Sequence, residues 1–229
     1  MKSIKPILVA GIILLIVSSN GIILCAAESP ERIVLVTGFE PFANHDINPS
    51  QLIAENLSGK IIDGATVVGI VAPVIYGGSV DVITAAIETY DPCVVISIGM
   101  GAGLSKIQVE KVGINIKSAT IPDNEGNMVL FRRIAFFGPF IRLSSLPVRQ
   151  IVNEMKNANI SAKISFHAGT FICNEVLYGV LCHIAKNDLS INAGFIHVPL
   201  LSSQNPETGM ELGTMIEATE IAIKTSLNR

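Results

Sequence analysis

From residue 31 onward, the sequence alternates short runs rich in β-branched residues with longer amphipathic runs. Residues 32–38 (RIVLVTG) predict a buried strand, and residues 48–59 predict a helix with Pro49 near its first turn and Gly59 at its end. The same alternation predicts strands at residues 65–74, 93–103, 162–169 and 193–201, and helices at residues 79–90, 147–160, 171–186 and 209–227. Alternating strands and helices are typical of α/β layered folds, in which helices cover the faces of a sheet.

Residues 111–147 interrupt this alternation. They contain strand-like segments and loops but no helix of useful length. Long irregular segments inside a compact domain are more often binding loops or lids than simple connections. We find no internal repeat, linker or low-complexity tract, and 229 residues suit one domain. Residues 28–229 are therefore predicted to form a single domain.

Residues 1–27 have the composition of an export signal. Lys2 and Lys5 precede a long apolar run at residues 6–25, and the small residues of CAAES follow. This pattern predicts a secretory signal peptide that is removed near Ala27, so that the mature protein is exported to the periplasm or the extracellular space. An uncleaved N-terminal membrane anchor is the alternative, because the run approaches the roughly 20 apolar residues that span a bilayer.

The overall charge argues against nucleic acid as a partner. The chain carries 16 basic and 19 acidic residues, and loss of Lys2 and Lys5 with the leader leaves 14 basic residues and a formal charge of −5. Proteins that bind nucleic acid through its phosphates present clustered positive charge. The charge balance therefore suggests neither nucleic acid nor an anionic surface as a partner.

Cysteine and histidine spacing argues against a disulfide framework and against a metal site. Loss of Cys25 with the leader leaves Cys93, Cys173 and Cys182, an odd number without C-x-x-C spacing. The four histidines show no paired helical spacing with Cys, Asp or Glu of the kind that binds zinc. We therefore predict no bound metal ion.

The stretch GTFICNEVLYG, residues 169–179, places Cys173 in the first turn of a predicted helix. Unpaired backbone N–H groups and the helix dipole at that position stabilise a thiolate and lower the pKa of a cysteine from its usual value of roughly 8.5. The alternative is a small apolar side chain packed under the helix, which is the commoner fate of a free cysteine. Position alone leaves both interpretations open.

His197 and Glu110 favour the reactive interpretation. His197 ends a predicted strand, and the carboxyl ends of the strands form the ligand-binding edge of an open α/β sheet. Glu110 lies in the otherwise apolar, strand-like residues 107–116, where a buried carboxylate would need a partner such as an imidazole. A core histidine and an exposed edge acid beside Lys111 are the alternatives. Cysteine, histidine and an acid together resemble the constellation of a thiol hydrolase.

Four sequence motifs, in order along the chain, carry a resemblance to a known family. They are LVTGFEPF followed by NPS, VEKVGINI with IPDNEGN, HAGTFICNEVLYG, and GFIHVPLL. From about residue 32 to about residue 200, the chain resembles the pyroglutamyl peptidase I (pyrrolidone carboxylate peptidase) family of cysteine peptidases. The resemblance implies a single α/β/α sandwich domain with a mixed, mostly parallel sheet. It also implies hydrolysis of the N-terminal pyroglutamyl group from peptides through a thioester acyl-enzyme, without a cofactor.

The resemblance further implies roles for individual residues. Cys173 matches the nucleophile of the family, His197 its catalytic histidine and Glu110 its third catalytic member. The side chains expected to hold the lactam ring of pyroglutamate are Phe39, Phe42, Met100, Ile121, Phe171 and Ile172. The family includes tetramers as well as monomers, which allows a homo-oligomer with the apolar region around FFGPFIRL as its contact.

Three positions depart from the family pattern. Met100 stands where glutamine is common, Thr120 where arginine is common, and His167 where asparagine is frequent. These departures support two alternative interpretations. One is a catalytically weak or inactive homologue that binds pyroglutamyl-like peptides, and the other is a thiol amidase for another small acyl group.

Overall fold

The structure is a computed structural model that describes residues 17–18, 21–22 and 32–228. The chain divides into two compact units, residues 1–31 and residues 32–229. In the first unit, β1 (Val17–Ser18) and β2 (Gly21–Ile22) form an antiparallel pair. The predicted cleavage near Ala27 lies outside the described residues. Among the described helices, none has both the length and the apolar character needed to cross a bilayer.

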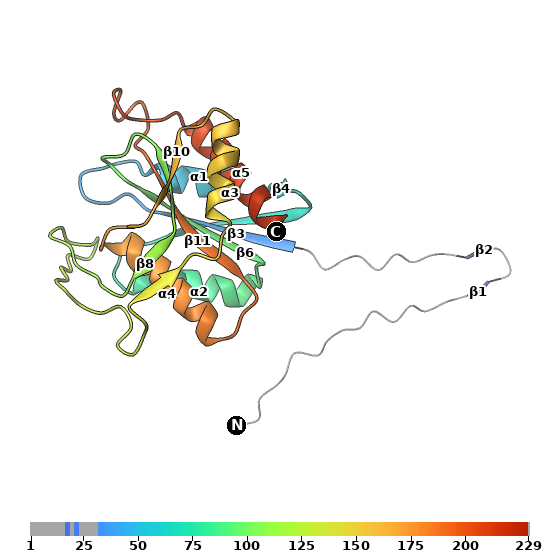
Figure 1. Ribbon diagram of the computed structural model, residues 1–229, viewed down its shortest axis with the longest axis horizontal. Coiled ribbons are helices and arrows are strands. Elements are labelled where there is room, and N and C mark those ends of the chain that lie inside the picture. The colour runs from blue at the N-terminus through green and yellow to red at the C-terminus, as the bar shows by residue number, and fades with distance from the viewer. Residues whose placement is uncertain (1–16, 19–20, 23–31, 229) are drawn as a thin grey trace. The chain divides into compact units, whose positions relative to one another are not determined.

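A seven-stranded mixed sheet organises the second unit (Figure 1), with the strand order β10-β7-β11-β6-β3-β5-β4. Four neighbouring strands, β11, β6, β3 and β5, run parallel, whereas β7 is antiparallel to β11 and β4 is antiparallel to β5. The strands are β3 (Arg32–Phe39), β4 (Ile61–Ile62), β5 (Ala65–Ala72), β6 (Val94–Met100), β7 (Ile107–Glu110), β10 (Ala162–Ser165) and β11 (Asn192–Val198). The predicted α/β fold with a mixed, mostly parallel sheet is confirmed.

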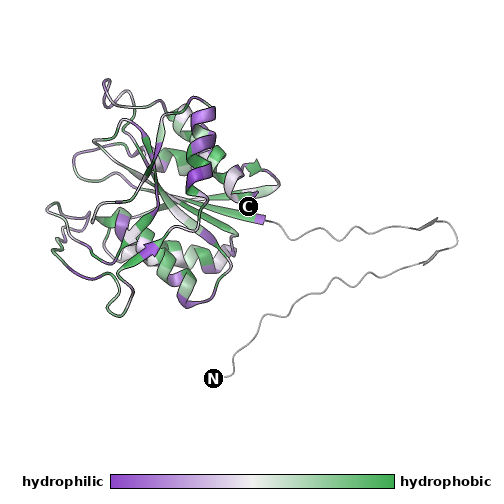
Figure 2. Cartoon of the chain, in the orientation of Figure 1, coloured by the Kyte–Doolittle hydropathy of each residue, from purple (hydrophilic) through white to green (hydrophobic). Residues whose placement is uncertain are grey.

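Helices cover both faces of this sheet because its central strands are apolar on both sides. In β3, Val34 and Val36 face the cluster that contains α1 (Pro49–Leu57), α3 (Val148–Asn157) and α5 (Leu212–Leu227). Leu35, between them, faces the cluster that contains α2 (Gly78–Tyr90) and α4 (Ile172–Lys186). This alternation follows from the two-residue period of a strand. Figure 2 shows the strands at the centre mostly hydrophobic and the outer side of α3 hydrophilic.

The connection between β3 and α1 is held tightly at its start. Asn48 caps α1 by accepting the Ser50 N–H at 3.1 Å, and Ser50 Oγ accepts the Phe39 N–H at 3.1 Å. A side chain at Gly38 would lie 2.1 Å from the Ser50 carbonyl oxygen, so only glycine permits this close approach of strand and helix. These contacts fix Phe39 at the carboxyl end of β3.

Residues 111–147 contain no helix, as predicted, and their strand-like segments form a second, smaller sheet. β8 (Val112–Ile114) pairs antiparallel with β9 (Ile141–Leu143), and we call residues 112–143 the aromatic arm. The arm protrudes from the layered body at the lower left of Figure 1. The sequence predicts one strand-like segment over residues 107–116, but the structure divides it after Glu110. The Lys111 N–H still bonds to the Ser165 carbonyl of β10, and the chain then leaves the main sheet.

The aromatic arm packs on α4 through side chains of that helix. Asn174 accepts the Ile114 N–H at 2.9 Å and donates to the carbonyls of Ile114 and Ile116 at 2.9 and 2.8 Å. The Tyr178 hydroxyl donates to the Pro139 carbonyl at 2.5 Å. The buried amide of Asn174 thus satisfies backbone groups of the arm that a neighbouring strand would otherwise bind.

Candidate active site

Cys173 lies in the first turn of α4, where the sequence places it. The helix begins at Ile172 with Phe171 as its N-cap, and the Glu175 N–H donates to the Phe171 carbonyl. The N–H groups that precede Glu175 lack a carbonyl one turn earlier in the helix. The Cys173 side chain is half-buried and its thiol is not in a disulfide. Cys173 therefore lies among unpaired backbone N–H groups at the positive end of the helix dipole.

Gly99 of β6 forms the floor beneath the sulfur. A methyl group on Gly99 would lie 3.0 Å from Cys173 Sγ and 2.7 Å from Cζ of Phe195. His197 is paired with Gly99 in the register between β11 and β6. The sulfur and the imidazole therefore meet over one backbone position of the sheet, and each contributes to the electrostatic environment of the other.

Glu110 orients the imidazole from the neighbouring strand. Glu110 Oε1 lies 2.9 Å from His197 Nδ1, and the Glu110 side chain is 0% exposed while that of His197 is 12% exposed. β7 lies between β10 and β11, so Glu110 is not an exposed edge acid. The second oxygen, Oε2, is buried without a hydrogen-bond partner among the described residues. His197 is therefore the direct partner of this carboxylate.

Two anionic groups control the protonation of His197. Burial lowers the pKa of the imidazole, but the charge of the Cys173 thiolate and its hydrogen bond, followed by those of Glu110, raise the pKa to about 10. At neutral pH, His197 is therefore positively charged beside the sulfur. An imidazolium next to a cysteine at a helix N-terminus stabilises the thiolate, which is the nucleophilic form.

A narrow pocket opens directly beside Cys173, and its cavity volume of about 10 Å³ shows that its walls lie close together. Its walls are mostly aromatic and apolar, and they carry no ionisable side chain apart from the cysteine. It is lined by Phe39, Phe42, Asn48, Val74, Gly99, Met100, Phe171, Ile172 and Cys173. Such walls suit a small, uncharged ring.

Five of the six predicted pocket residues are in this lining, and Ile121 is not. Ile121 lies on the aromatic arm and is 42% exposed. Sequence reasoning missed Asn48, Val74 and Gly99. Asn48 stands in the NPS motif at a predicted helix start, whereas Gly99 and Val74 lie within the predicted strands 93–103 and 65–74 and carry no further local signal.

The remaining departures from the family pattern lie away from the pocket lining. Thr120 is exposed on the aromatic arm, and His167 is exposed in the turn before α4. His167 Nδ1 accepts the Gly169 N–H at 2.8 Å, and Gly169 has a positive φ of 77°. His167 thus shapes the turn that leads into the helix of Cys173. In the part of the chain that the structure describes, no group of three His, Cys, Asp or Glu side chains could hold a metal ion.

A polar cluster supports the Phe171 wall of the pocket. Lys117 Nζ lies 2.5 Å from Glu175 Oε1, and the Tyr76 N–H donates to Asp123 Oδ2 at 3.1 Å. The Tyr76 ring packs edge-on against Phe171, with 5.5 Å between the ring centroids. Burial, followed by the Glu175 and Asp123 charges, raises the pKa of Tyr76 to about 12, so its phenol stays neutral. The cluster joins the loop after β5, the aromatic arm and α4 behind the pocket.

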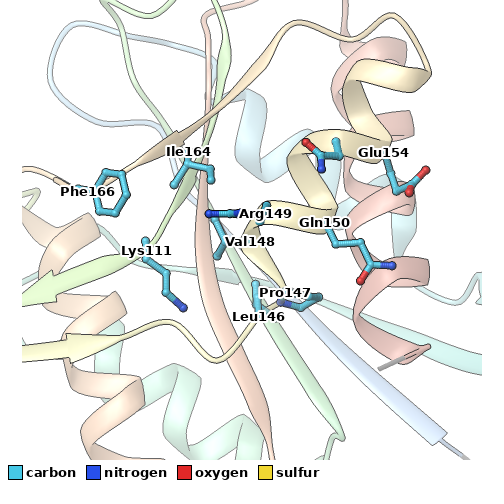
Figure 3. A pocket seen from close by; sticks show the side chains of 10 residues that line it. Lys111, Leu146, Pro147, Val148, Arg149, Gln150, Glu154, Ile164 and Phe166 are labelled. Atoms are coloured by element: carbon cyan, nitrogen blue, oxygen red, sulfur yellow. The ribbon is translucent and has the colours of Figure 1, made fainter.

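A larger, open groove lies elsewhere, between the β10 edge of the sheet and α3 (Figure 3). It measures about 560 Å³ and includes Lys111, Arg149 and Phe166 in its lining. Figure 3 shows Ile164 and Phe166 on one side and Gln150 and Glu154 of α3 on the other. Neither Cys173 nor His197 contributes to it. The groove is therefore separate from the candidate active site.

Comparison with known proteins connects this site to one family. Residues 32–229 match the pyroglutamyl peptidase family. The chain is 42% identical over 195 residues to the pyrrolidone-carboxylate peptidase of a Thermoanaerobacter species, with 83% of this chain and 96% of the relative covered. It superposes on the crystal structure of pyroglutamyl peptidase I from Bacillus amyloliquefaciens with a TM-score of 0.85 and 35% identity, over 87% of this chain and 96% of the other. The pyrrolidone carboxyl peptidase of Thermococcus litoralis gives a TM-score of 0.84 at 35% identity, over 86% and 94% of the two chains.

Proposed function

The chain belongs to the pyroglutamyl peptidase family of cysteine peptidases, and we propose that Cys173, His197 and Glu110 carry out its reaction, hydrolysis of the N-terminal pyroglutamyl group from peptides. The observation that carries this assignment is the meeting of the three side chains beside the aromatic pocket. The Glu110 carboxylate lies 2.9 Å from the imidazole, and the imidazole shares the Gly99 floor with the sulfur. Nucleophile, base and orienting acid are thus side by side at the mouth of a narrow, uncharged pocket.

In the first half of the reaction, the Cys173 thiolate attacks the pyroglutamyl carbonyl carbon and a C–S bond forms. The free N–H groups at the start of α4 are positioned to stabilise the oxyanion of the tetrahedral intermediate. Because Nδ1 of His197 faces Glu110, Nε2 is the nitrogen that donates its proton to the leaving amine. The C–N bond breaks, the shortened peptide leaves, and a pyroglutamyl thioester remains on Cys173.

In the second half, water hydrolyses the thioester. Neutral His197 takes a proton from the attacking water, and Glu110 stabilises the imidazolium that forms. Collapse of the second tetrahedral intermediate breaks the C–S bond, releases free pyroglutamate and regenerates the thiolate–imidazolium pair. Each step uses only side chains and backbone groups of this chain.

The pocket explains why a blocked N-terminus is accepted. The lactam of pyroglutamate is neutral, whereas an ordinary N-terminus carries an ammonium group. Transfer of that charge into a pocket lined by Phe39, Phe42 and Phe171 has a large desolvation penalty, and no carboxylate in the lining offsets it. Asn48 is the one amide side chain in the lining, but its Oδ1 accepts from the Ser50 N–H and hydroxyl and its Nδ2 donates to the Glu40 carbonyl, so it holds the wall of the pocket in place. No observation on the described residues favours a binding-only homologue or an amidase for another acyl group.

The direct test is release of a fluorogenic amine from a pyroglutamyl amide under reducing conditions. The wild-type chain is expected to release the amine, and Cys173→Ala is expected to abolish release. Cys182→Ala is the matched control, since Cys182 is a half-buried free cysteine of the same helix and is absent from the pocket lining. Binding without release by the wild type, or full activity of Cys173→Ala, would contradict the assignment.

We also propose that the mature protein is exported after cleavage near Ala27. Support comes from the sequence of residues 1–27, with its basic start, apolar run and small residues before the cleavage site. N-terminal sequencing of the protein from the cells that make it is expected to begin at Glu28, in the exported fraction. A full-length chain that remains in the membrane fraction would instead support the anchor.

A further inference from the structure

The aromatic arm exposes apolar side chains that the proposed peptidase reaction does not use. Phe131 is 84% exposed, Phe136 75% and Phe137 95%, and Phe131 and Phe140 line one shallow hollow. Aromatic side chains bury roughly 150–250 Å² each. Three exposed phenylalanine rings therefore present an apolar area on the order of 300–600 Å², which is comparable with the largest apolar patch on a typical monomer. From Met128 on, the exposed apolar residues of the arm are Met128, Leu130, Phe131, Phe136, Phe137, Phe140, Ile141 and Leu143.

The same segment is basic, although the chain as a whole is acidic. The arm contains Lys117, Arg132, Arg133 and Arg142 against Asp123 and Glu125, and its residues from 126 on contain no Asp or Glu. Arg132 and Arg133 are exposed, and Arg133 Nη1 donates to the Phe136 carbonyl at 2.8 Å, which keeps a guanidinium beside the aromatic tip. The overall charge suggests no anionic surface as a partner, but overall charge averages over the molecule and conceals this local concentration.

The exposed rings are held in place by ordered backbone. Asn115 is buried, accepts the Ala135 N–H at 2.8 Å and donates to the carbonyls of Ala135 and Gly138 at 2.7 and 3.2 Å. Phe136 and Phe137 then pack edge to face, with 4.8 Å between their centroids. The aromatic tip therefore needs no rearrangement before it contacts a partner, which lowers the entropic cost of binding.

We propose that the aromatic arm docks on the surface of an anionic phospholipid bilayer. The phenylalanine rings enter the boundary between headgroups and acyl chains, and Arg132 and Arg133 pair with lipid phosphates. A second copy of the chain suits this surface less well than a bilayer does. In a symmetric dimer the same patch of both copies would meet, and the arginines would repel one another. Asn174, next to Cys173, ties the arm to α4, so docking would keep the active site near the bilayer.

The test is sedimentation of residues 28–229 with vesicles, which separates the arm from the apolar leader. This part is expected to fold alone, since residues 32–229 form their own compact unit with both apolar cores, and solved relatives consist almost entirely of the matching region. Vesicles of phosphatidylcholine mixed with phosphatidylglycerol are compared with vesicles of phosphatidylcholine alone. Binding is expected to the mixed vesicles, with a marked loss on phosphatidylcholine alone and at high salt.

Arm variants and matched controls give the decisive comparison. Arg132→Gln with Arg133→Gln is expected to weaken binding roughly thirtyfold, from about 1 kcal/mol per basic residue near an anionic surface. Phe136→Ser with Phe137→Ser is expected to weaken it at least tenfold. The controls Arg149→Gln and Ile61→Ser alter an exposed arginine and an exposed isoleucine outside the arm and are expected to bind like the wild type.

Three outcomes would overturn the proposal. The first is no binding of residues 28–229 to the mixed vesicles, and the second is equal binding by arm variants and controls. The third is a concentration-dependent dimer in analytical ultracentrifugation that the arm variants abolish, without vesicle binding, which would assign the patch to a second copy. Pyroglutamyl amidase activity is measured on each variant separately, so failure here is distinguishable from failure of the peptidase assignment.

Discussion

The aromatic pocket and the aromatic arm use the same residue type in opposite ways. At the active site, Phe39 and Phe195 are almost fully buried, with 6.2 Å between their ring centroids, and Phe195 lies beside Gly99 and the His197 ring. On the arm, Phe136 and Phe137 project into solvent although their backbone is ordered. Both regions are rich in phenylalanine, so the exposure of the rings, and not their number, distinguishes the catalytic region from the surface that contacts a partner. Changes at the pocket are therefore expected to affect catalysis, and changes on the arm are expected to affect association.

The largest effect is expected from His197→Ala. Loss of the general acid and base lowers kcat about 10²–10⁴-fold, because neither departure of the amine nor attack by water is then assisted. Steady-state kinetics on the pyroglutamyl amide measure this change. His183→Ala is the control, since His183 lies near the far end of α4 and is expected to change kcat less than about twofold. An equal loss of kcat in both variants would show that His197 has no special role in catalysis.

Gly99→Ala is expected to reduce kcat/KM roughly a hundredfold. The added methyl group would lie 2.7 Å from the Phe195 ring and 3.0 Å from Cys173 Sγ, so the sulfur must shift, and small misplacements of a nucleophile are costly. Gly103→Ala is the matched control, because an added methyl group there meets no atom within 4 Å. Near wild-type kinetics for Gly99→Ala would show that the floor beneath the sulfur is not tight.

Glu110→Gln is expected to cost about tenfold in kcat/KM and to change the pH profile. Glutamine keeps a hydrogen bond to Nδ1 but removes a charge, and about tenfold corresponds to one pKa unit. The His197 pKa is raised to about 10, so the imidazolium that protonates the leaving amine persists below that pH and loses its proton as the pH rises through it, while the sulfur stays a thiolate. The alkaline limb of kcat/KM is expected to lie near pH 10 in the wild type and at lower pH in the variant. An unchanged limb would separate Glu110 from His197.

The smallest effect is expected from Phe137→Ala. The ring is 95% exposed, so its loss should leave the free energy of unfolding within about 0.5 kcal/mol of the wild type and leave kcat unchanged. Urea denaturation measures the first quantity and the amide assay the second. Phe39→Ala is the comparison from the pocket and should destabilise the protein far more. A large loss in Phe137→Ala would show that the arm belongs to the folded core.

The sequence predicts the helices and strands of the regular alternation, because an element that is buried on one or two faces carries apolar residues at a regular spacing. β3, α2 and α4 are of this kind. β4 has two residues, too few for a period, and the division of residues 107–116 after Glu110 depends on contacts with β10 that no local pattern records. Strand order is likewise a property of the assembled sheet. The mixed sheet was expected from the family resemblance, whereas the α/β layers followed from the alternation itself.

The candidate site was predictable to the extent that its chemistry has local signals. Cys173 stands at a helix start, and Glu110 is an acid in an apolar segment. Gly99 was missed because its role lies in a close approach that only the packed sheet reveals, and Asn48 because its capping role concealed its place in the pocket. Ile121 was expected in the pocket by resemblance, but the arm that carries it leaves it outside the lining.

The central claim is that Cys173 becomes acylated by the pyroglutamyl group that the neighbouring pocket holds. Intact-protein and peptide mass spectrometry after rapid acid quenching of the enzyme with an activated pyroglutamyl ester tests this directly. The account predicts one pyroglutamyl adduct, on the peptide that contains Cys173, formed in the wild type and in Cys182→Ala and absent from Cys173→Ala. Hydrolysis of the ester by Cys173→Ala at the wild-type rate, or an adduct on Cys93 or Cys182 instead, would contradict it.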